Sequence, residues 1–185
     1  MSNIKTFKDV RHLAEGADQN TIITPRGLDS SVYAKLNERL GDEYGAHYFY
    51  RAASDWCKNM SYFKAAAYFQ AEAESELSHS KMIRDYLTMW NVMPQIPERA
   101  HDHEFSSLVD IINKAYTLEL NLFDNYVKDS QAVFSKDLAT FDFLQGLREI
   151  QTQSVGEYSD LLNALMLINV SNKFEVLYFE NQYFS

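Results

Sequence analysis

The chain has 185 residues, of which 46% are hydrophobic and 23% are charged, so it can form one ordinary globular domain with a sizeable core. The net charge of −9 argues against non-specific binding to nucleic acid or to an anionic membrane surface, and it favours the attraction of cations. The single cysteine, Cys57, excludes an internal disulfide framework and a cysteine-rich zinc site.

The N-terminal segment, residues 1–30, is expected to be a polar extension outside the core. Its acidic and basic residues are mixed, and Pro25 and Gly27 near its end are typical of a turn. It lacks the apolar stretch of a secretory signal peptide, and no segment of the chain is apolar for long enough to span a bilayer. We therefore expect a cytoplasmic protein without membrane partners, in which residues 31–185 form the folded domain.

Two long helices are predicted in the first half of this domain, because apolar residues recur there with helical period. Ser31 is the expected N-cap of the first, which runs to about Lys58. After a break at 59–61, the second helix extends to about residue 90 and ends before Pro94.

The connection over residues 91–105 is long for two neighbouring antiparallel helices and suits a crossover along the side of a bundle. A third helix is expected to start at Ser106 or Ser107, and a short gap at 135–137 leads to a fourth. The tail, 172–185, has an ambiguous period and fits either a short helix or an extended strand. The chain is therefore predicted to be all-α, a four-helix bundle with one long crossover connection and a short C-terminal segment.

Each predicted helix carries a metal-competent polar residue within its inward apolar stripe. These residues are Glu43, Glu76 with His79, Glu119 and Gln151. A carboxylate in an apolar core is costly unless it is paired or binds a metal, so their alignment suggests a shared use.

Glu76 and His79 form the most specific element, because positions i and i+3 share one helix face and can reach a single metal ion. This Glu-x-x-His spacing is the one found in di-iron carboxylate bundles. An internal network of salt bridges or hydrogen bonds remains the alternative. Carboxylates, one imidazole and one amide, without a thiolate, favour iron or manganese over structural zinc.

The sequence resembles the bacterial-type non-haem ferritins over about residues 32–180. The supporting segments are Leu36-Asn37-Glu38, Glu43-Tyr44, Tyr50, Glu76-x-x-His79, Asp85-Tyr86-Leu87 and Thr140-Phe141-Asp142-Phe143-Leu144-Gln145. The intervals between successive candidate ligands also fit this family.

The resemblance implies a site for two irons, Fe(II) before and Fe(III) after oxidation, within each subunit. Glu43 and His79 would bind the first iron, Glu76 would bridge both, and Glu119 would bind the second. Gln151 matches a neutral glutamine beside the second iron.

Three further residues have open roles. Tyr50 matches a tyrosine that can hydrogen-bond to the site or donate an electron, and it can equally be a core aromatic. His47 lies one turn after Glu43, and Glu72 lies one turn before Glu76. Both could contact the iron ligands or line an iron path, or form hydrogen bonds between helices.

The sequence departs from the family pattern in the neighbourhood of this site. Ser75 stands where many ferritins have a second glutamate, and Ile150, Gln153 and Ser154 replace carboxylates that build a third iron site in some bacterial ferritins. We therefore expect no third site and weaker binding of the second iron.

Other substitutions narrow the class. Leu77 stands where bacterioferritins have a haem-ligating methionine, so no haem is expected. Glu149-Ile-Gln-Thr152 replaces a second Glu-x-x-His motif, which disfavours rubrerythrin-like relatives. Glu98-Arg-Ala-His101 repeats the spacing but follows Pro97 in an expected loop, so it is interpreted as a solvated patch.

The implied function is oxidation of Fe(II) by O₂ or H₂O₂ and storage of the ferric mineral inside a shell of 24 identical subunits. The alternatives are a non-catalytic iron-binding shell subunit and a DNA-protecting mini-ferritin. The acidic charge argues against DNA binding. In mini-ferritins, moreover, the ligands lie between subunits.

Overall fold

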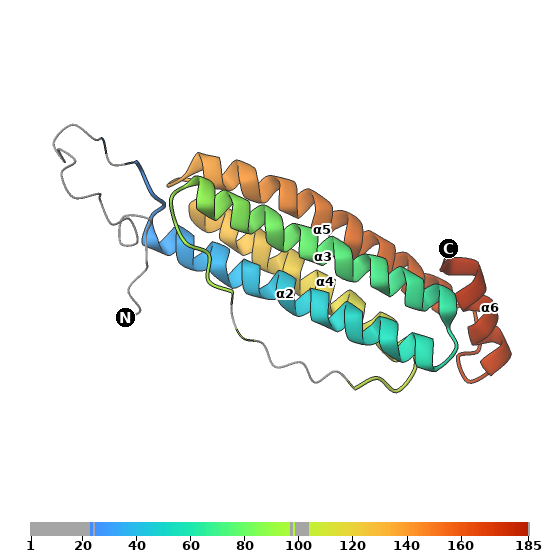
Figure 1. The fold of residues 1–185 in the computed structure, drawn as a ribbon. Helices are drawn as coiled ribbons and strands as arrows, with labels where there is room; N and C mark the ends of the chain where they lie inside the picture. Colours follow the sequence, from blue (N-terminus) through green and yellow to red (C-terminus); the bar gives the residue numbers. More distant parts are fainter. Residues whose placement is uncertain (1–22, 24, 97, 99–103, 185) are drawn as a thin grey trace.

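The computed structural model describes residues 23, 25–96, 98 and 104–184. Its helices are α2 (Ser30–Asn59), α3 (Phe63–Met89), α4 (Leu108–Val133), α5 (Leu138–Leu165) and α6 (Lys173–Tyr183). The four long helices lie side by side as a bundle, and α6 packs across one end of it (Figure 1). None of these helices combines the length and the apolar character needed to cross a membrane.

The connection between α3 and α4 has the predicted crossover topology. The end of α3 and the start of α4 lie at opposite ends of the bundle, whereas α2 with α3 and α4 with α5 are joined by short turns (Figure 1). The predicted all-α four-helix bundle is therefore confirmed. Most of the N-terminal extension lies outside the described residues, so its separation from the domain stays a prediction.

The helix starts follow from side chains that accept hydrogen bonds from free backbone N–H groups. The prediction of Ser31 as the first N-cap is wrong: α2 begins at Ser30, and Asp29 is its N-cap. The carboxylate of Asp29 accepts a hydrogen bond from Ser31 N at 2.8 Å, which is the usual capping geometry. The predicted start of the third helix is confirmed, since Ser107 caps α4 through Asp110 N at 3.0 Å.

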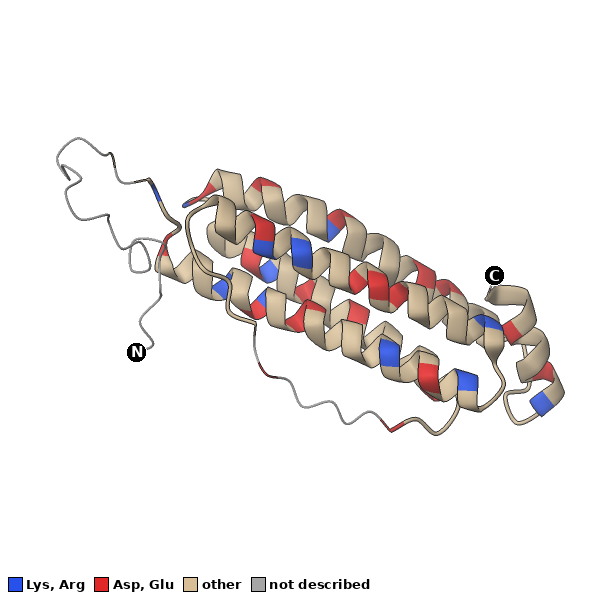
Figure 2. Ribbon diagram, in the orientation of Figure 1, with Lys and Arg blue, Asp and Glu red and all other residues tan. Residues whose placement is uncertain are grey.

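Two apolar clusters fill the bundle, and the predicted metal ligands lie where the two clusters meet. One cluster, towards α6, includes Phe69 and Phe179; the other, towards the start of α2, includes Leu36 and Leu87. Acidic side chains are distributed along all four long helices, in keeping with the net charge (Figure 2).

The tail resolves as helix α6, which docks through Val176, Phe179 and Phe184. Glu180 is also buried and reaches the start of α3, where its Oε1 accepts hydrogen bonds from Lys64 N at 2.7 Å and Ala65 N at 3.0 Å. Tyr62, the residue at the N-cap position of α3, makes no capping bond with its own side chain. A residue near the C-terminus therefore supplies the missing cap.

Candidate metal centre

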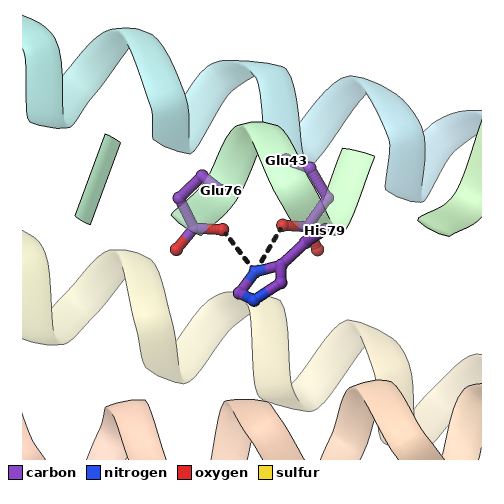
Figure 3. A group of neighbouring side chains, drawn as sticks. All are labelled: Glu43, Glu76 and His79. Atoms are coloured by element: carbon purple, nitrogen blue, oxygen red, sulfur yellow. Dashed lines mark hydrogen bonds and ion pairs between the residues drawn. The ribbon is translucent and has the colours of Figure 1, made fainter. Parts of the chain in front are cut away.

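Glu43 from α2 meets Glu76 and His79 from α3 in the middle of the bundle (Figure 3). One possible ligand atom from each residue lies within 4.8 Å of the other two. His79 Nδ1 is 3.0 Å from Glu76 Oε2 and 3.5 Å from Glu43 Oε2. The i,i+3 spacing on α3 brings the carboxylate and imidazole together, and the packing of α2 against α3 adds the second carboxylate.

The carboxylates of this cluster are buried, so their charge depends on nearby protons or cations for compensation. Glu43 and Glu76 are only 1% and 3% exposed. Glu43 Oε2 is buried, and among the described residues it makes no hydrogen bond. An uncompensated buried carboxylate oxygen is unfavourable unless a cation or a proton lies beside it.

The pKa values of the three side chains reflect the same burial of charge. Burial, reinforced by the charge of Glu43, raises the pKa of Glu76 well above its usual range. Burial alone would lower the pKa of His79, but contacts with Glu43 and Glu76 outweigh it and raise the pKa to about 10. Burial also acts to raise the pKa of Glu43, yet its contacts with His79, Glu76 and Tyr126 hold it below the ordinary value. In the metal-free protein a proton on His79 therefore partly fills the role that a cation can take.

Glu119, Gln151 and Tyr50 form a second group, contributed by α4, α5 and α2. Tyr50 OH donates to Glu119 Oε1, and Gln151 Nε2 donates to Glu119 Oε2 and, at 3.1 Å, to the Glu119 backbone oxygen. Burial raises the pKa of Glu119 to about 7. Both carboxylate oxygens thus accept a hydrogen bond, and each keeps a further lone pair for a metal.

The two groups interact electrostatically, although Glu119 is not part of the cluster formed by Glu43, Glu76 and His79. The charge of Glu119 contributes to the raised pKa of Glu76, and the charge of Glu43 contributes to that of Glu119. The structure therefore brings together donors for one metal position and places the donors predicted for a second beside it. This donor set has three carboxylates, one imidazole, one amide and no thiolate, and it fits iron or manganese better than structural zinc.

His47 and Glu72 both form hydrogen bonds between helices, the structural role that the sequence left open. His47 Nδ1 donates to the Ala73 backbone oxygen at 2.6 Å. Glu72 Oε2 accepts from Tyr158 OH at 3.1 Å. These contacts occupy one polar atom of each side chain, and a metal role for either residue stays a prediction.

Two contacts of the cluster were not predicted. Tyr126 OH donates to Glu43 Oε1, a contact between helices that no expectation from the sequence included. Its separation from Glu119 equals that of Tyr50 from Glu43, which is the one signal the sequence offers. Ser75 Oγ lies 3.4 Å from His79 Nε2, on the side of the ring away from the carboxylates.

The loop motif that repeats the Glu-x-x-His spacing falls mostly outside the described residues. Glu98 is exposed, and residues 99–103 are not among those described. The interpretation as a solvated patch therefore stays a prediction.

Known proteins share both the sequence pattern and the fold. The chain is 28% identical over 155 residues to the bacterial non-heme ferritin of Escherichia coli O6:H1, covering 82% of this chain and 92% of the relative. It is 27% identical over 145 residues to that of Staphylococcus epidermidis, covering 76% and 86%.

Solved ferritins have the same architecture. The Chlorobium tepidum ferritin superposes with a TM-score of 0.75 at 26% identity, covering 84% of this chain and 96% of the other. An open pore ferritin from the archaeon Archaeoglobus fulgidus gives 0.77 at 18% identity, with the same coverages, and this likeness concerns the fold alone. The ferritin-like domain of the ferritin family matches residues 33–168, most of the chain. The chain therefore belongs to the ferritin family.

Proposed function

We propose that this protein stores iron and oxidises Fe(II) to Fe(III) at a two-iron centre inside each subunit. The observation that carries the proposal is the buried cluster of Glu43, Glu76 and His79, with Glu43 Oε2 left without a hydrogen bond among the described residues. Two carboxylates and an imidazole buried together between two helices are costly for stability, and a bound cation would offset that cost.

The substrates are Fe(II) and an oxidant, O₂ or H₂O₂. Two Fe(II) ions each give up one electron; O₂ takes the two electrons and two protons to form H₂O₂, or H₂O₂ takes them to form two waters. Glu43 and His79 would hold the first ion, Glu76 would bridge, and Glu119 would hold the second. Carboxylate oxygens suit the more highly charged Fe(III) that results.

Gln151 should make it easier for the Fe(III) product to leave the second position. Its amide adds no negative charge beside Glu119, so the second position should hold Fe(III) less firmly than a third carboxylate would. Release towards a cavity would then permit mineral growth. We place that cavity inside a closed homo-oligomer of about 24 subunits, in keeping with the ferritin family and with the symmetry usual for such assemblies.

An anaerobic Fe(II) titration followed by exposure to air tests the oxidation step. Wild type and His79→Ala are compared by the near-ultraviolet absorbance of Fe(III), and Ser78→Ala serves as the matched control. Ser78 is the exposed neighbour of His79 and its hydroxyl bonds to the Glu74 backbone oxygen. We expect His79→Ala to slow initial oxidation at least about tenfold, with Ser78→Ala unchanged.

Equal rates in wild type and His79→Ala would refute the ferroxidase assignment and leave a passive iron-binding shell. Native mass spectrometry tests the assembly separately. A mass near 24 times that of the 21.5 kDa subunit is expected, and a stable monomer would refute the shell.

A further inference from the structure

The metal centre contains two tyrosine–glutamate contacts that cross between the same two helices. Tyr50 on α2 donates to Glu119 on α4, and Tyr126 on α4 donates to Glu43 on α2. In each helix the tyrosine follows the glutamate by seven positions, which is two helical turns on the same face. All four side chains are at most 1% exposed.

The two contacts nevertheless leave their carboxylates in different states. Glu119 has one oxygen bonded to Tyr50 and the other to Gln151. Glu43 has Oε1 bonded to Tyr126, while Oε2 makes no hydrogen bond among the described residues and lies 3.5 Å from His79 Nδ1. The contact with Tyr126 therefore engages one of the two equivalent oxygens of Glu43 and leaves the other beside His79.

The ring of Tyr126 is itself well fixed. It belongs to the buried apolar cluster that also includes Leu36, Leu40 and Leu144. A phenol held this way can orient a carboxylate without loss of side-chain freedom at the moment of metal binding, because its rotamer is already determined by packing.

We propose that Tyr126 is a positioning residue of the metal centre: its hydroxyl holds Glu43 Oε1 so that Oε2 faces Glu76 and His79 as a ligand for the first iron. The proposal rests on the proposed function and adds a residue to it. Without the hydroxyl, Glu43 can rotate, and either oxygen or both can approach the metal. The affinity and the coordination geometry of the first position should then change, while the second position keeps its own contacts.

Anaerobic Co(II) titration tests this inference, since the d–d absorption of Co(II) reports coordination geometry without any oxidation. Tyr126→Phe removes one oxygen and keeps the ring. Tyr86→Phe is the matched control, because Tyr86 is also buried and loses a hydrogen bond, to Thr140 at 3.0 Å, outside the site. His79→Ala identifies which Co(II) signal belongs to the first position. Circular dichroism verifies that each variant keeps its helices.

We expect Tyr126→Phe to weaken Co(II) binding at the His79-dependent position about tenfold and to alter its d–d bands, with Tyr86→Phe like wild type. Tyr126→Gln restores a donor of the kind that Gln151 already provides to Glu119, and it should bind Co(II) more tightly than Tyr126→Phe. If Tyr126→Phe does not fold, Tyr126→Gln decides the question, and a loss as large as that in His79→Ala would overturn the inference.

Two negative results have different meanings. His79-dependent Co(II) binding with wild-type affinity and spectrum in Tyr126→Phe would overturn the role of Tyr126 and leave the proposed function intact. Wild-type protein without any His79-dependent Co(II) binding would overturn both.

Discussion

Glu180, five positions before the last residue, accepts a hydrogen bond from the backbone N–H of Lys64 at 2.7 Å and so caps the start of α3. The same oxygen accepts from Ala65 N at 3.0 Å. The first N–H groups of a helix have no partner within the helix, and the positive end of the helix dipole also favours a carboxylate there. The docking of α6 and the stability of α3 are therefore coupled.

Removal of this cap should destabilise the protein. We expect Glu180→Ala to lower the free energy of unfolding by roughly 1–2 kcal/mol, because two backbone N–H groups at the start of α3 lose their acceptor. Glu180→Gln keeps an acceptor and should be affected less. Thermal unfolding followed by circular dichroism at one subunit concentration measures both, with the exposed Gln182→Ala as control. Equal melting temperatures for Glu180→Ala and wild type would contradict the capping role.

Cys57 should be unreactive in the native protein. Its side chain is fully buried, and burial, reinforced by the charge of Glu180, raises the pKa of the thiol to about 12. Since the thiolate is the nucleophile, alkylation by iodoacetamide at pH 8 should be slow until the protein unfolds. Mass spectrometry measures the modified fraction over time. Glu180→Ala should speed the reaction if α6 opens as a unit, and rapid labelling of native wild type would show that the site is not closed.

The metal-free protein should lose stability as the pH rises. The folded-state pKa of Glu119, about 7, lies above the ordinary value of 4.5, and that of His79, about 10, lies above the ordinary value of 6.5. Both groups bind protons more tightly when folded, so their contribution is complete below the lower values and is lost as the pH rises through the higher ones. Denaturation in the presence of a chelator, at pH values from 5 to 9, measures the trend.

A matched variant separates the two titrations. Glu119→Gln should flatten the pH dependence below pH 7 and leave the part caused by His79. Added Zn(II) or Co(II) should reverse the trend, because a cation replaces the protons and binds better at higher pH. Metal-free wild type that becomes more stable from pH 5 to pH 8 would contradict the assigned shifts.

The sequence was enough to predict contacts within one helix and contacts between the inward apolar faces of two helices. The pairing of Glu76 with His79 is local, and the inward period of α2 is enough to aim Glu43 at them. The cap formed by Glu180 joins positions 116 apart, so no local pattern contains it. The choice between Asp29 and Ser31 as N-cap depends on backbone angles, which two adjacent capping residue types do not distinguish.

Tyr126 shows why the rest of the site was not predictable. An inward tyrosine has the same sequence signature whether its hydroxyl meets a backbone oxygen, as Tyr33 does with Met93 at 3.0 Å, or a candidate iron ligand. The difference arises from the rotation of α4 relative to α2. Helical period determines which face is buried and not the partner that each polar tip meets.

Gln151 gives the sharpest test of how the centre releases its product. In Gln151→Glu a carboxylate replaces the amide that donates to Glu119 Oε2, so a further negative charge lies beside the second iron position. We expect this variant to bind Fe(III) more firmly and therefore to recover more slowly between two successive additions of Fe(II). Stopped-flow absorbance gives the initial rate of each addition, and the ratio of the two rates measures the recovery.

The first addition is the internal control for this variant. It should proceed at a rate similar to wild type, because Glu43, Glu76 and His79 keep their positions, whereas the second should be slowed several-fold. Gln145→Glu, an exposed substitution on the same helix, adds the same charge without contact to Glu119 and should recover like wild type. Since charge at contact distance in a buried site acts far more strongly than at the surface, recovery equal to wild type in Gln151→Glu would show that release is not governed by the second position.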